Sequence, residues 1–72
     1  MPSIDIQLLE GVFSDAEKAE IIRRVTDVLG AVGGEAIRDG TSVRVHEVRS
    51  GCYGYAGKAL TTQDALAMRA RG

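Results

Sequence analysis

The chain has 72 residues, a net charge of −1 and 44% hydrophobic residues, and this length predicts a single domain spanning residues 1–72. Its 9 basic and 10 acidic residues are mixed rather than gathered into a basic stripe, so we expect no nucleic-acid partner. A small anion could still bind, because it needs only one or two local cations. The sequence lacks a signal peptide and any apolar run of about 18 residues, so we expect a cytoplasmic protein without a membrane span.

Stability is the first question that so short a chain raises. Small domains usually add disulfides, a metal or subunit contacts to a limited core. Cys52 is the single cysteine, which excludes an internal disulfide, and we interpret it as a packing residue. One cysteine and one histidine, His46, cannot supply the roughly four ligands of a structural zinc site. We therefore expect a homo-oligomer, or a subunit of a mixed oligomer.

The first half of the chain predicts a strand followed by a helix. Ile4, Ile6 and Leu8 alternate with polar residues, which indicates a strand with one buried face. The sequence "SDAE", residues 14–17, is a capping box that begins a helix. The apolar stripe of that helix contains Ile22, Val25, Leu29 and Val32, and two glycines, Gly33 and Gly34, end it.

The second half predicts another strand and a compact C-terminal segment. Residues 35–41 are interpreted as a connection, and "SVRVHEV", residues 42–48, as a strand with Arg44 and His46 on one face. Residues 50–59, "SGCYGYAGKA", predict a turn or small hairpin. Residues 61–72 predict a short helix capped by Thr61 or Thr62.

Together these elements predict an α/β fold built on a β-α-β unit. A strand, a helix and a strand in this order favour parallel pairing with a right-handed crossover. A two-stranded parallel sheet covered by one helix leaves a face and two edges unpaired. We therefore expect subunits to join their sheets.

Pro2 is the first candidate for chemistry. Removal of Met1 would make the Pro2 nitrogen a secondary amine at the chain terminus. The reference pKa of an α-amino group is about 7.7–8.0, and burial or nearby cations lower it. Such an amine is suited to act as a general base and, once protonated, as a general acid. The alternative interpretation is that the proline only precedes a strand.

Four segments carry a resemblance that spans nearly the whole chain: "PSIDIQLLEG", "SDAEKAEIIRRVTDVL", "TSVRV" and "GCYGYAGKALTTQDALAM". With them the sequence resembles the 4-oxalocrotonate tautomerase family. The resemblance implies a β-α-β fold assembled as a hexamer, a trimer of dimers. It also implies that an amino-terminal proline moves a proton between enol and keto forms of a small carboxylic acid, with arginines binding the substrate and an aromatic residue lining the pocket. It implies no cofactor and no metal.

The resemblance assigns site residues unevenly. Pro2 matches the catalytic proline, and Tyr53 stands where the family usually has Phe or Trp. Val12 follows "LEG", where the best-known members have a substrate-binding arginine. Arg44 matches the second-strand arginine when "TSVRV" is aligned directly, and Arg38 is a second candidate from the connection. Both arginines could instead be solvated surface residues, and Tyr53 could be only an aromatic wall.

These observations lead to one main hypothesis and two alternatives. The main hypothesis is a homohexameric tautomerase acting on a small unsaturated or 2-keto carboxylic acid. The missing cation at Val12 motivates the first alternative, a non-catalytic or partner subunit of a mixed hexamer. The second alternative is a dehalogenase or hydratase of the same family. If Met1 is retained, the Pro2 nitrogen is an amide and cannot act as a base.

Overall fold

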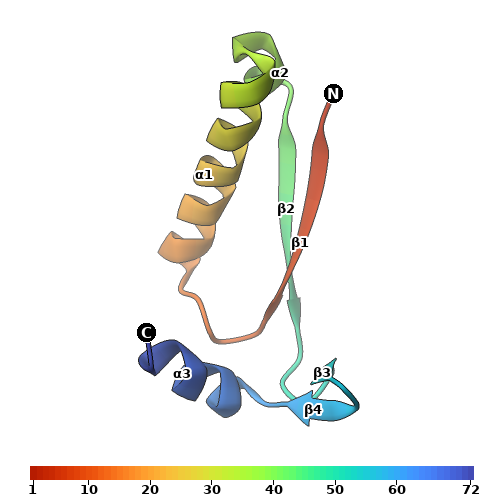
Figure 1. Cartoon of the computed structure of the whole chain (residues 1–72), viewed down its shortest axis with the longest axis vertical. Coiled ribbons are helices and arrows are strands. Elements are labelled where there is room, and N and C mark those ends of the chain that lie inside the picture. Colours follow the sequence, from red (N-terminus) through yellow and green to blue (C-terminus); the bar gives the residue numbers. More distant parts are fainter.

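The computed structural model describes residues 1–72 and contains seven elements. In chain order they are β1 (Ser3–Leu9), α1 (Asp15–Gly33), α2 (Glu35–Asp39), β2 (Ser42–Val48), β3 (Tyr53–Tyr55), β4 (Lys58–Leu60) and α3 (Thr62–Ala70). Figure 1 shows an elongated β-α-β part, with the β3–β4 hairpin and α3 beside the end of the two long strands. The order and type of the main elements confirm the predicted β-α-β unit, hairpin and terminal helix.

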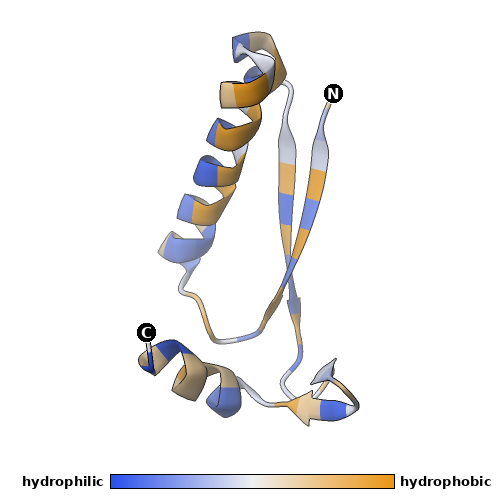
Figure 2. Ribbon diagram, viewed as in Figure 1, coloured by the Kyte–Doolittle hydropathy of each residue, from blue (hydrophilic) through white to orange (hydrophobic).

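The two long strands form the predicted parallel sheet. β1 and β2 pair in register from Ser3 opposite Ser42 to Leu9 opposite Val48. Exposed and half-buried side chains alternate along β1, as its period of two requires. Helix α1 covers one face, and Figure 2 shows its hydrophobic side turned toward the strands. The opposite, open face of the sheet carries the polar residues of both strands except Glu47, which pairs with Lys18 of α1.

Helix α1 begins and ends at the residues that the sequence indicates. The Ser14 hydroxyl accepts a hydrogen bond from the Glu17 amide, and the Glu17 carboxylate accepts one from the Ser14 amide. At the other end, Gly34 has a φ of 96°, in the left-handed region that glycine adopts without strain. Capping chemistry therefore sets both ends of this helix.

The connection between α1 and β2 is the part of the fold that the sequence prediction misread. Residues 35–41 are not irregular throughout, because α2 occupies Glu35–Asp39. Arg38 holds this short helix against α1: its Nε donates to Asp27 Oδ1 at 2.9 Å. A five-residue helix has little stability of its own and needs contacts with other parts of the chain. The contact of Arg38 with Asp27, eleven positions earlier, is such a contact, and the local sequence pattern does not reveal it.

The single chain has almost no fully buried core. Leu9, with 7% exposure, is the one buried residue. Val32, predicted to belong to the inward stripe of α1, is 88% exposed, and Val28 one turn earlier is also exposed. Val32 lies seven residues after the half-buried Val25 and so on the same side of α1, which shows that the apolar stripe is covered along only part of its length. None of the helices combines the length and the apolar character that crossing a membrane requires.

Candidate active site

Pro2 lies immediately before β1 and is half-buried. Its carbonyl accepts a hydrogen bond from the Ser42 amide at 3.0 Å, which extends the β1–β2 pairing to the proline. The preceding Met1 side chain lies against Gly40, where a Cβ would sit 1.4 Å from the Met1 Cε. The turn before β2 and the start of the chain are therefore neighbours.

Arg44 projects from β2 onto the open face of the sheet and points toward the Pro2 end. Its Nε donates to Asp5 Oδ1 at 2.8 Å and its Nη1 donates to Ser42 Oγ at 2.6 Å. Its Nη2 donates to Ser3 Oγ, next to the proline in sequence. The structure therefore brings two of the predicted site residues, Pro2 and Arg44, to the same end of the sheet.

Asp5 is the carboxylate partner of this arginine. The hydrogen bond from Arg44, and then that from His46, hold the pKa of the Asp5 carboxyl below its ordinary value. His46 Nε2 lies 3.5 Å from the same Asp5 oxygen. At neutral pH, Asp5 is therefore ionised and offsets the positive charge that Arg44 brings to this end of the sheet.

Arg38 does not join this group. It lies on α2, and its Nη2 contacts Asp27 Oδ1 at 2.8 Å, in addition to the hydrogen bond from Nε. Asp39 lies 4.0 Å from its Nη1. Arg38 thus faces α1 within its own chain, and its role in a substrate site stays a prediction.

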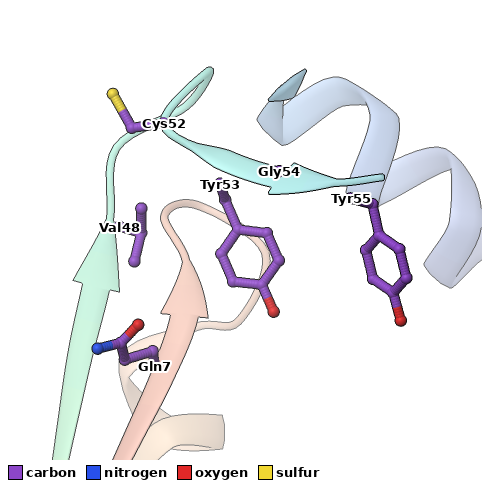
Figure 3. Close-up of a pocket in the computed structure, with 6 residues that line it drawn as sticks. All are labelled: Gln7, Val48, Cys52, Tyr53, Gly54 and Tyr55. Atoms are coloured by element: carbon purple, nitrogen blue, oxygen red, sulfur yellow. The ribbon is translucent and has the colours of Figure 1, made fainter. Parts of the chain in front are cut away.

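Tyr53 lies at the other end of the sheet, on β3. It lines a cavity of about 350 Å³ together with Gln7, Val48, Cys52, Gly54 and Tyr55. In Figure 3 the two tyrosine rings project from the same side of β3, and Gln7 lies below them on the end of β1. Cys52 is exposed, so the prediction that it is a packing residue is wrong for this chain. The six lining residues include no Asp, Glu, Lys, Arg or His.

One chain does not bring Pro2 and Tyr53 together. They lie near opposite ends of β1, which has seven residues. At about 3.3 Å per residue, the strand separates them by about 20 Å. A small carboxylic acid cannot span this distance, so a single chain contains two separate halves of the predicted site.

The segment after Gly11 contains no cation of its own, but one reaches it from α3. Arg69 Nη1 donates to the Val12 carbonyl at 2.6 Å, and the guanidinium lies 4.8 Å from the centroid of the Phe13 ring. The same arginine hydrogen-bonds the Glu17 carboxylate, with Nη1 at 3.0 Å from Oε1. Arg69 therefore holds the C-terminal helix to the start of α1.

Sequence reasoning missed Asp5 and Ser3 as partners of Arg44, and Gln7 and Tyr55 as lining residues. A signal for Asp5 existed, because in parallel strands that start level at Ser3 and Ser42, Asp5 falls opposite Arg44. No cluster of three or more His, Cys, Asp or Glu residues is placed to hold a metal ion.

Comparison with known proteins places this fold and these residues in a family. The sequence model of the family described as "Tautomerase enzyme" matches residues 2–63. The chain belongs to the tautomerase family. No curated protein sequence matches it.

Solved structures agree with this family membership. A structure from a study of the 4-oxalocrotonate tautomerase isozymes of Methylibium petroleiphilum is 26% identical, with a TM-score of 0.72 over 81% of this chain and 90% of that one. DmpI from Helicobacter pylori is 28% identical, with a TM-score of 0.72 over 82% of this chain and 95% of its own. YwhB, a homologue of 4-oxalocrotonate tautomerase, is 27% identical, with a TM-score of 0.70 over 88% and 97% of the two chains.

Proposed function

We propose that this chain is a cofactor-independent tautomerase. It moves a proton between the enol and keto forms of a small unsaturated or 2-keto carboxylic acid. The observation that carries the proposal is the family match over residues 2–63, which begins at Pro2 and includes Arg44. The neighbouring positions of these two residues at one end of the sheet support it further, because the base and a carboxylate-binding cation must act on one small molecule.

The proposed chemistry uses the terminal amine of Pro2 after Met1 is removed. The neutral amine takes the proton from the enol hydroxyl, and the resulting ammonium returns a proton to carbon, which yields the keto acid. Arg44 donates hydrogen bonds to the substrate carboxylate. It can do so by exchanging the hydroxyls of Ser3 and Ser42 for carboxylate oxygens, which are stronger acceptors.

We further propose that a second copy of the chain completes each site. The separation of about 20 Å between Pro2 and Tyr53 requires that the Tyr53 cavity of one copy receive the Pro2 end of another. The unpaired edges of the β1–β2 sheet and the uncovered apolar residues support assembly, and we propose a homohexamer arranged as a trimer of dimers. In such an assembly Arg38 would reach a neighbouring site only by leaving Asp27.

The test combines intact mass spectrometry with a Pro2→Ala variant. Alanine also permits removal of Met1, so both proteins should lack the methionine and differ only in the terminal amine. We expect kcat/KM for ketonisation of an enol acid such as phenylenolpyruvate to fall about 100-fold or more in the variant, the scale of general acid–base catalysis. Circular dichroism should show an unchanged fold.

Two outcomes would contradict the proposal. Undiminished turnover by Pro2→Ala would exclude the proline as the base. A wild-type protein that retains Met1 and has no activity would favour the alternative of a partner subunit in a mixed hexamer.

A further inference from the structure

The positive charges of this chain are largely neutralised by its own carboxylates. Six of its basic residues lie within 4.0 Å of an acidic side chain: Lys18, Arg23, Arg24, Arg38, Arg44 and Arg69. Arg44 at the Pro2 end already holds the Asp5 carboxylate, and Arg38, which faces α1, holds that of Asp27. The open face of the sheet therefore presents one arginine, and an aspartate lies directly against it.

The Tyr53 end has the opposite character, because it offers aromatic surface and neutral polar groups. The cavity beside Tyr53 contains two phenol rings, the Gln7 amide and the Cys52 thiol. Arg49 follows the end of β2 but does not line this cavity. A groove of about 230 Å³ adjoins it, shares Gln7, Tyr53 and Tyr55 with it, and has nine hydrophobic residues among the ten that line it.

We infer that the substrates are monocarboxylates: enol or 2-keto acids with one carboxylate, bound by Arg44, and an aromatic or other apolar tail placed against Tyr53 and Tyr55. This inference rests on the proposed tautomerase function. Arg49 after β2 and Lys58 opposite Tyr55 on β4 do not line the cavity or the groove, so a second carboxylate there would lose hydration without a cation in direct contact. Asp5 would also repel a dianion as it approaches Arg44.

The test compares two enol acids that differ in the number of carboxylates. Phenylenolpyruvate has one and an aromatic ring, whereas 2-hydroxymuconate has two and no ring. We expect kcat/KM to be about 10-fold or more higher for phenylenolpyruvate, the discrimination that one uncompensated polar group typically causes. A higher kcat/KM for 2-hydroxymuconate would overturn the inference and leave the tautomerase function intact. No turnover of either would overturn the proposed function itself.

Two variants test whether the named residues set this preference. Asp5→Asn removes the charge beside Arg44, and Tyr55→Lys adds a cation at a tyrosine that is 71% exposed. Each should raise kcat/KM for 2-hydroxymuconate relative to phenylenolpyruvate about 5-fold or more. Glu20→Gln is the matched control, because this carboxylate pairs with Arg24 on α1, away from both ends of the candidate site, and its loss should leave the ratio unchanged. An unchanged ratio in both test variants, or an equal change in the control, would overturn the inference.

Discussion

The two ends of the β1–β2 sheet differ in how they are held and in what they offer a ligand. At the Pro2 end, backbone pairing between β1 and β2 places the proline, and the nearby open face carries two charged side chains, Arg44 and Asp5. At the Tyr53 end, a separate hairpin forms an uncharged aromatic cavity. A carboxylate-binding cation and an apolar pocket are thus made by different parts of the chain.

The C-terminal part is fastened to the sheet by a few side chains rather than by extended backbone pairing. The Thr62 hydroxyl donates to the Glu10 carbonyl at 2.7 Å, and the Ser50 hydroxyl accepts from the Thr62 amide at 2.9 Å. Gly11, with a φ of 77°, permits this approach, because a Cβ there would sit 2.9 Å from Thr62 Cγ2. We therefore expect the hairpin and α3 to open more readily than the β1–β2 pairing.

The largest effect on the charged end, apart from replacing Pro2, should come from Arg44→Ala. We expect kcat/KM for phenylenolpyruvate to fall about 100-fold, because charge-assisted hydrogen bonds to the substrate are lost. Arg24→Ala is the matched control: this arginine is also exposed and pairs only with Glu20, one turn away on α1. Equal activity of the two variants in steady-state kinetics would show that Arg44 is a surface arginine.

Arg69→Ala tests the attachment of the C-terminal part. Loss of the contacts to Val12 and Glu17 should increase amide hydrogen exchange in α3 and in residues 12–17, while the amides between β1 and β2 keep their protection. Arg71→Ala, two residues further along and without an ion pair, should leave both regions unchanged. Uniform loss of protection in Arg69→Ala would show that α3 stabilises the whole fold, including the β1–β2 sheet, and is not a separately attached part.

Much of the β-α-β part could be predicted because its signals are local. The alternation in β1, the capping box at Ser14 and the glycines at 33 and 34 each act within a few residues, and the structure reproduces all three. Helix α2 escaped prediction because a tertiary contact between Arg38 and Asp27 stabilises it. The exposure of Val32 was not predicted, because the sequence pattern of an apolar stripe does not indicate which part of the stripe is covered by another element.

The site was less predictable than the fold for a related reason. Pro2, Arg44 and Tyr53 could be proposed as candidates from sequence, yet the partner of Arg44 depends on strand register, which places Asp5 opposite it. The separation of Pro2 from Tyr53 depends on the path of the whole chain. Residue patterns identify which groups are present, whereas their charge balance and spacing follow from the pairing of distant segments.

The smallest expected effect concerns the pH dependence of the link between α3 and α1. Hydrogen bonds from Arg69, and then from the Ser14 amide, lower the pKa of Glu17 from 4.5 to about 2. Because the folded state has the lower pKa, the ionised carboxylate stabilises the protein fully above about pH 4.5, and this contribution is lost as the pH falls toward 2.

Glu17→Gln removes this contribution and keeps a side-chain oxygen for the capping box. At pH 7 the free energy of unfolding of the wild-type protein should therefore exceed that of the variant. The difference between the two proteins should shrink as the pH falls from 4.5 to 2. Chemical denaturation at equal protein concentration measures it, with Glu20→Gln as the control on the same helix. The carboxyls of Asp5 and Asp64 also have lowered pKa values but are present in both proteins, so the difference isolates Glu17. A difference that stays constant with pH would show that Arg69 does not hold the Glu17 carboxylate in solution, and that α3 is attached through its other contacts, such as those of Thr62 and of Arg69 with Val12.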